Sequence, residues 1–387
     1  MKITVSTPVP LICGLILGFL PLALCSNNLQ KIDAPATSET DSIDRINRLQ
    51  TKTLPEAVYR IEKKSTSKKT VFDDLLARAE NGVLEITLTT DLQKLMHNDA
   101  HTDYQPAFLT DAAGQTEYRL KVKPRGKFRR KVCDFPPLKL NFSKDRLEDA
   151  GLEGKYDKLK LVTHCTDKKL NAKDNVLREY LVYKMYNELT DNSYRVLLVK
   201  IKYVDLHNSV RPVRRYGILI EDTDEMANRL NGEECECHGL SDDLIARAPA
   251  NLTAMFQYMV GNEDWDVPGL RNVKAVKLHT GSDFYNLIVP YDFDFSGVVN
   301  AEYAIPDPNL QHSTLQQRHF FGKFDTEEDF ALMSGHFMNK SRDIIGLVRN
   351  FKLLPLSSRL EIANYLNEFF LTLEDEAAAK EVFLRGL

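Results

Sequence analysis

Apolar and polar residues alternate in several short segments of the first half of the chain, which is the period of a half-buried β-strand. Segments with this character are 83–89, 118–123, 137–142, 158–162, 194–204 and 216–221. Helical spacing precedes them at 70–79 and interrupts them at 174–189. The pattern therefore predicts a sheet-rich region at 81–222 with one inserted helix.

After residue 222 the pattern becomes mainly helical. Segments 241–248 and 252–260 have helical spacing, and Ser241 is the expected N-cap of the first. A short strand is expected at 285–290, and a capping box at 325–328 opens a helical region that Pro355 interrupts. We therefore expect an α+β chain with a β-rich N-terminal lobe at 81–222 and an α-helical C-terminal lobe at 223–387.

The N-terminus has the layout of a secretory signal peptide over residues 1–25. Lys2 precedes an apolar run from Val9 to Leu24, and the chain turns polar after Cys25. Cys25 is either a lipidation site of a lipoprotein or the last residue before plain cleavage, and an uncleaved anchor is a third reading. Residues 26–80 read as a linker followed by a helix. We expect export to the periplasm, cell envelope or extracellular space, with membrane contact through the signal or a lipid anchor alone.

Composition fits a globular protein and argues against one class of partner. The 387 residues are 43% hydrophobic and 27% charged, with a formal net charge of −4. Such a mildly acidic chain lacks the positive surface that non-specific nucleic-acid binding requires, so we expect no nucleic-acid partner.

Four cysteines lie beyond the signal segment, and four allow three disulfide connectivities; they are Cys133, Cys165, Cys235 and Cys237. Disulfides or free thiols are favoured over a metal site, because Cys235 and Cys237 lack a second ligand pair at zinc-like spacing.

Basic residues gather around a single glycine in segment 121–131, which contains seven of them. Gly126 permits close backbone approach to a phosphate, and neighbours such as Arg125 can neutralise it. A solvated hairpin tip is the alternative.

On the strand at 158–162, Lys158 and Lys160 share a face, and one of them could bind phosphates when paired with Glu179 of the following helix. Surface solvation is the alternative there too.

Carboxylates and amides are concentrated in segment 261–297. The loop 261–272 holds Asp264, Asp266 and Asn272 together with the chain's single Trp, and Asp292 and Asp294 follow a strand. Alternate residues of a strand point the same way, so both of the latter could meet one cation. Phosphoryl transfer needs a carboxylate that orients a hydroxyl and oxygen ligands for Mg²⁺. A calcium-stabilised loop or Asp caps on turns are the alternatives.

These segments resemble, in the same order over residues 83–300, the atypical kinases of the spore-coat protein H (CotH) family. The similar segments are 118–131 with Arg125-Gly126, 158–161 with 174–179, 216–224, 262–272 and 289–294. Two departures are Lys127-Phe128, where that family has Ser after the glycine, and Tyr291, where it has Trp.

The resemblance implies a two-lobed protein-kinase-like fold and an exported kinase that transfers phosphate from ATP, with Mg²⁺, to a protein hydroxyl. It implies Asp264 as the catalytic residue, with Asp266 as its competitor. The implied metal ligands are Asn272, Asp292 and Asp294. The implied nucleotide-binding residues are Arg125, Gly126, Lys158, Lys160, Glu179 and Glu221, the last as a hinge residue near the adenine. The alternative is an envelope or surface protein that keeps the fold, binds or builds structure, and catalyses nothing.

Overall fold

The computed structural model describes residues 54–60, 68–96, 103–112, 114, 116–166, 169–280 and 283–385. The expected signal peptide 1–25, including Cys25, and residues 26–53 of the expected linker lie outside the described residues. Among the helices that the structure describes, none combines the length and apolar character needed to cross a bilayer.

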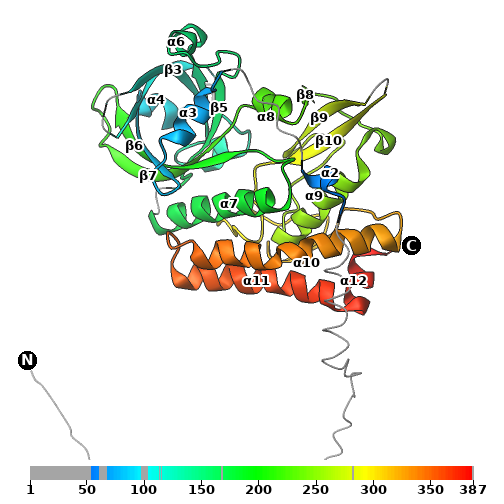
Figure 1. The fold of residues 1–387 in the computed structure, drawn as a ribbon. Coiled ribbons are helices and arrows are strands. Elements are labelled where there is room, and N and C mark those ends of the chain that lie inside the picture. The colour runs from blue at the N-terminus through cyan, green and yellow to red at the C-terminus, as the bar shows by residue number, and fades with distance from the viewer. Residues whose placement is uncertain are drawn as a thin grey trace, which may run out of the picture. The chain divides into compact units, whose positions relative to one another are not determined.

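Seven strands close into a β-barrel (Figure 1). They are β1 (Val83–Thr90), β2 (Gln105–Asp111), β3 (Glu117–Pro124), β4 (Leu138–Phe142), β5 (Lys158–Val162), β6 (Val196–Asp205) and β7 (Val213–Ile220). Their order around the barrel is β1-β2-β3-β4-β5-β7-β6. Neighbouring strands are antiparallel except at the closing pair, where β1 and β6 run parallel with Val83 opposite Leu198.

The expected two-lobed kinase-like fold is wrong. Strands β1 to β7 form a closed barrel, and a separate three-stranded sheet lies among the helices of the second half. Pairing of β1 with β6 closes the barrel, because it joins the first strand to one far later in the chain and leaves neither with a free edge. That pairing is tertiary, so the alternation of side chains that predicted the individual strands did not reveal it.

The barrel interior is filled by the inward-facing residues of its strands. In β1, Leu84, Ile86 and Leu88 are buried whereas Glu85 is exposed, which is the period of two expected for a strand with one face in a core. Helices α3 (Val71–Ala77) and α4 (Leu92–Met96) add apolar side chains to the same core.

The second half combines a small sheet with long helices. The sheet has the order β10-β9-β8, from β8 (Gly232–Cys235), β9 (Val273–Thr280) and β10 (Asp283–Pro290). The main helices are α7 (Lys169–Leu189), α9 (Arg247–Val260), α10 (Glu327–Asn350), α11 (Leu356–Glu374) and α12 (Glu376–Phe383). Helix α7 lies between the barrel strands β6 and β7 and helix α10, and α11 packs on α10 (Figure 1). Shorter helices are α2 (Glu56–Tyr59), α5 (Arg129–Val132), α6 (Lys144–Asp149) and α8 (Thr223–Arg229).

Most of the expected strands and the inserted helix are present in the structure. The six strands expected in the first half are β1, β3, β4, β5, β6 and β7, the strand expected at 285–290 is β10, and the inserted helix is α7. Strands β2, β8 and β9 were missed. Segment 241–248 was expected as a helix, but it holds a short 3₁₀ turn, Asp242–Leu244, before α9 begins at Arg247.

The four cysteines form two disulfides, Cys133–Cys165 and Cys235–Cys237. The expectation of disulfides rather than a metal site agrees with this pairing. Cys133 is the C-cap of α5, and Cys165 lies just beyond β5, so the first disulfide ties the basic segment after β3 to the barrel wall. The second closes a short loop at the end of β8.

Candidate functional site

A charged cleft of about 1020 Å³ lies between the barrel and the second half. Basic side chains dominate its barrel side and include Lys123, Arg125, Arg129, Lys139, Lys158 and Lys160. Oxygen-bearing side chains on the opposite side include Asp264, Asn272, Asp292 and Asp294. Arg271 and Lys274 also line the cleft from the second half, so cationic and anionic groups meet in one cavity, as the binding of a metal–phosphate complex requires.

The segment that follows β3 brings its arginines into the cleft. Gly126 has φ +77°, a left-handed conformation that glycine adopts without strain, and it turns the chain into the short helix α5. Arg125 Nη2 lies 3.9 Å from Asp292 Oδ2. The Arg129 side chain is only 6% exposed, whereas Phe128 beside it is exposed. Both residues of the predicted Arg125-Gly126 pair thus line the cleft.

Strand β5 presents Lys158 and Lys160 to the same cavity, while Leu159 and Leu161 between and beyond them point into the barrel core. The shared face that the sequence predicted for the two lysines is confirmed. Lys160 Nζ donates to Thr223 Oγ1 at 2.6 Å and lies over the rings of Tyr194 and Tyr291. Burial lowers the pKa of Lys160 to about 7, and the positive charge of Arg125 adds to this effect.

Asp292 and Asp294 are positioned by the aromatic residue between them. Phe293 is fully buried and meets the ring of Tyr183 at 4.7 Å between centroids, which fixes the chain just after β10. The backbone N–H of Asp292 donates to Tyr183 Oη at 2.8 Å. Asp292 has φ +65°, so the pair follows the strand rather than lying on it, yet both side chains line the cleft.

The two carboxylates converge on one nitrogen of Arg129. Nη2 of Arg129 lies 2.7 Å from Asp294 Oδ1, contacts Asp292 Oδ1, and lies 3.6 Å from Glu179 Oε1. Burial raises the pKa of Asp294 to about 6 and that of Glu179 to about 8, while Arg129 acts in the opposite direction on both. The site therefore gathers more negative charge than it would hold without a cation at its centre.

Asp264 and Asn272 form the other part of the acidic side. Asn272 Nδ2 donates to Asp264 Oδ2 at 2.8 Å and to the Asp264 carbonyl at 2.7 Å. Tyr291 N donates to the Asn272 carbonyl at 3.0 Å, which ties this loop to the segment that carries Asp292. Burial raises the pKa of Asp264, Arg271 lowers it, and Asp292 raises it further.

Gly261 sets the direction of the Asp264 loop. It ends helix α9 with φ +65°, and a Cβ atom placed there would lie 2.0 Å from Tyr365 Oη. Both the backbone conformation and the close approach require glycine. Asp266, the competing candidate in the same loop, accepts a hydrogen bond from Gly269 N and is outside the residues that line the cleft.

Two of the predicted nucleotide-binding residues do not line the cleft. Glu179 lies behind Arg129 on α7, and its cationic partner is Arg129, whereas Lys160 bonds to Thr223. The expected pairing of a β5 lysine with Glu179 is therefore not what the structure contains. Glu221 is fully buried at the end of β7, where it accepts from Arg195 Nε and from Arg229 Nη2, both at 2.6 Å. The family resemblance implied that Glu221 lies beside an adenine, but the structure places it in a buried ion-pair network.

Sequence reasoning missed several residues of the cleft. Arg129 was hidden within a run of basic residues, where no periodicity marks the one that is buried. Lys274 lies on the missed strand β9 and forms a 2.6 Å ion pair with Glu234 of β8. The alternation of Lys274 with Val273 and Ala275 was a usable signal for that strand.

The oxygen ligands present suit Mg²⁺ held together with a phosphate ligand. Among the described residues, no group of three or more His, Cys, Asp and Glu side chains is arranged to hold a metal ion by itself. Mg²⁺ is commonly bound by one or two carboxylates, with water and substrate phosphates as its other ligands. Asp292 and Asp294 supply two carboxylates that already converge on a cationic atom, and Asn272 lines the same cleft. The residues present thus fit the expected Mg²⁺.

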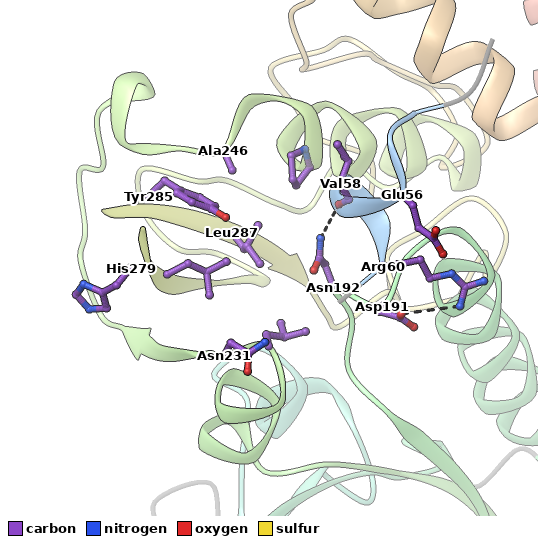
Figure 2. Close-up of a pocket in the computed structure, with 13 residues that line it drawn as sticks. Glu56, Val58, Arg60, Asp191, Asn192, Asn231, Ala246, His279, Tyr285 and Leu287 are labelled. Atoms are coloured by element: carbon purple, nitrogen blue, oxygen red, sulfur yellow. Dashed lines mark hydrogen bonds and ion pairs between the residues drawn. The ribbon is translucent and has the colours of Figure 1, made fainter. Parts of the chain in front are cut away.

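A second cavity, of about 1050 Å³, lies beside α2 and the small sheet (Figure 2). Two contacts are drawn at its wall: Arg60 Nη1 lies 3.8 Å from Asp191 Oδ2, and Asn192 Nδ2 donates to the Val58 carbonyl at 3.0 Å. The rest of the lining mixes apolar side chains such as Leu278 and Leu287 with the polar side chains of Glu56, Asn231 and His279. This cavity lacks the facing charges of the charged cleft, so we assign the candidate chemistry to the cleft.

The charged cleft can bind anions on its barrel side and a cation at Asp292 and Asp294. It brings together eight of the residues that the sequence singled out, and it excludes Glu179, Glu221 and the competing candidate Asp266. No family model matches this chain and no curated protein matches it, so the similarity to the spore-coat protein H kinases stays a prediction.

Proposed function

We propose that this protein is an exported phosphotransferase whose charged cleft binds ATP with Mg²⁺ and transfers the terminal phosphate to a protein hydroxyl. One observation carries the proposal. Asp292 and Asp294 converge on a single cationic atom, in a cavity that also contains Asp264 and the basic residues of β5. Positioning and charge stabilisation provide nearly all of the catalysis in phosphoryl transfer, and this cleft supplies groups for both.

Each residue has a definite role in the proposed reaction. Asp264 orients the acceptor hydroxyl and accepts its proton as the hydroxyl oxygen bonds to the terminal phosphorus. The bond from that phosphorus to the bridging oxygen breaks, and ADP leaves. Lys160 and Arg125 neutralise phosphate oxygens, and Asn272, Asp292 and Asp294 are the ligands for Mg²⁺, which when bound stabilises charge on the phosphates.

The proposal does not depend on a kinase-like fold. Function resides in the site, and the same chemistry occurs on unrelated folds. The closed barrel differs from the expected two-lobed architecture, yet the cleft residues still lie together, because β5, the segment after β3 and the segment after β10 all border one cavity.

ATP together with Mg²⁺ should stabilise the full chain, whereas Mg²⁺ alone should have little effect. A ligand at a hundredfold excess over its Kd adds about 2.7 kcal/mol to the free energy of unfolding. The measurement is a thermal shift, accompanied by a transfer assay with ATP labelled in its terminal phosphate and candidate acceptor proteins. Absence of any nucleotide-dependent stabilisation would count against the proposal.

Nucleotide affinity should weaken about tenfold as the pH rises from 6 to 8, because Lys160, with a pKa of about 7, loses its charge over this range. The groups that face Lys160 are Arg125, Lys274, Asp222, Glu234, Tyr194, Tyr291 and Thr223. Titration calorimetry of the wild type and of Lys160→Met at each pH separates this dependence from titration of the nucleotide itself. Equal pH profiles for the two proteins would exclude Lys160 as the phosphate-binding cation.

The same pKa has a consequence for stability. The folded-state value lies below the ordinary value of 10.5, so the folded protein resists protonation of Lys160. Between pH 10.5 and about 7 the unfolded chain binds a proton at Lys160 that the folded protein does not bind. The free energy of unfolding is therefore highest above pH 10.5, falls as the pH drops towards about 7, and changes no further through Lys160 below that pH.

A non-catalytic binding protein of the envelope or surface is the second candidate. The observation that favours it is the position of Arg129, whose guanidinium already neutralises the carboxylates of Asp292 and Asp294. Such a protein would have the same thermal midpoint with and without ATP and Mg²⁺, so the thermal shift distinguishes the two candidates.

A further inference from the structure

We propose that Arg129 is the resident counter-ion of Asp292 and Asp294 and exchanges with a divalent cation, moving onto phosphate oxygens when a metal–polyphosphate complex enters the cleft. This inference rests on the proposed function, because it concerns the same site. Its consequence is cooperative binding: the metal ion binds weakly alone and tightly together with the polyphosphate.

The guanidinium occupies the position that a metal ion needs. One nitrogen of Arg129 contacts Asp292 Oδ1 and lies 2.7 Å from Asp294 Oδ1. Mg²⁺ requires its oxygen ligands at about 2.0–2.1 Å, so it would have to take the place of this nitrogen. Two cations a few ångströms apart repel strongly when little water separates them, and the Arg129 side chain is 6% exposed. The carboxylates can therefore hold the guanidinium or the metal ion, but not both.

Arg129 needs an anion in order to leave. Separating a buried ion pair without a replacement partner costs several kcal/mol. The barrel side of the cleft supplies a place for such a partner, because Arg125, Lys139 and Lys160 line it beside Arg129. A polyphosphate bound there brings oxygens to the guanidinium, which binds phosphate bidentately. Metal entry and phosphate entry are thus coupled through one side chain.

The backbone around Arg129 permits the exchange with the main chain in place. Arg129 is the first residue of α5, a helix of four residues, and the disulfide from Cys133 holds the end of that helix to the segment after β5. Its long side chain can therefore swing between the carboxylates and the phosphate site while its Cα atom remains at the cleft edge.

Calorimetric titration of the full chain with Mn²⁺ alone, and again with the non-hydrolysable ATP analogue AMP-PNP present, tests the exchange. Wild type should bind Mn²⁺ at least tenfold more tightly with the analogue than without it. Arg129→Gln should bind Mn²⁺ alone at least tenfold more tightly than wild type. Arg119→Gln, which removes an exposed arginine of β3 outside the cleft, should behave as wild type.

Arg129→Lys provides a second variant for the case that Arg129→Gln does not fold, because it keeps a cation beside the carboxylates. Its single point charge replaces the planar guanidinium, so its Mn²⁺ affinity should lie between those of wild type and Arg129→Gln. Unchanged Mn²⁺ affinity in the folded Arg129 variants would overturn the exchange. A third outcome is that the Arg129 variants bind Mn²⁺ more tightly than wild type while wild type does not bind AMP-PNP. Arg129 would then compete with the metal ion, but the proposed function and the movement of Arg129 onto phosphate would both be refuted.

Discussion

Asp292→Asn is expected to reduce phosphate transfer at least a hundredfold while the protein remains folded. The substitution removes one of two carboxylates that converge on the proposed metal position, and the loss of one well-placed electrostatic group typically costs two to three orders of magnitude in rate. Asn suits this position better than Ala, because Asp292 has φ +65° and Asn tolerates the left-handed conformation. The measurements are the transfer rate, the Mn²⁺ affinity and the thermal midpoint of the variant.

The fold should survive because Arg129 keeps two of its three anionic partners, Asp294 and Glu179. Asp145→Asn is the matched control, since Asp145 is an exposed residue of α6 away from the cleft. Transfer at the wild-type rate in folded Asp292→Asn would show that the metal assignment is wrong.

Glu221→Gln is expected to lower the free energy of unfolding by about 3–5 kcal/mol, the cost of breaking a buried charge pair. Glu221 is fully buried, and its carboxylate accepts hydrogen bonds from Arg195 and Arg229. Arg195 also pairs with Asp73 at 2.8 Å and with Glu225, so the network ties β7 to helices α3 and α8. Urea denaturation measures the loss through the midpoint at constant slope.

Nucleotide affinity separates this structural role of Glu221 from the nucleotide-binding role that the family resemblance implied. In Glu221→Gln at a temperature where it is folded, AMP-PNP affinity should equal that of wild type. Glu117→Gln, at an exposed site on β3, controls for the loss of a surface carboxylate. Reduced AMP-PNP affinity of Glu221→Gln without any loss of stability would show that Glu221 contacts the nucleotide, contrary to the structural role.

Local elements could be predicted from the sequence, but their closure into a barrel could not. The alternation in β1 and β5 marks a strand wherever it pairs, so those strands were found. Strand β2 was missed although it pairs with both β1 and β3. The parallel partner of β1 is β6, and nothing in the periodicity of either strand specifies the other. The two-lobed expectation failed at this tertiary step.

The candidate site was predictable to the extent that its chemistry is local in the chain. Lys158 alternates with Lys160 on β5, so spacing alone indicated their shared face. Asp292 and Asp294 lie beyond the end of β10, so their convergence depends on the buried Phe293 between them and not on strand alternation. The partners of buried charges could not be found in this way. Glu179 pairs with an arginine from the segment after β3, and Glu221 with arginines before β6 and in α8. Only the folded chain brings these charges together.

The parallel β1–β6 pair also constrains how the protein is made. Val83 cannot pair with Leu198 until the chain has been synthesised beyond the inserted helix α7. Until then, β1 lacks its partner β6 and the barrel cannot close. Sequence-distant contacts of this kind slow folding, because the entropy of a long loop must be lost before the contact forms. Strand β5, which carries Lys158 and Lys160, likewise lacks one of its two neighbouring strands until β7 has been synthesised.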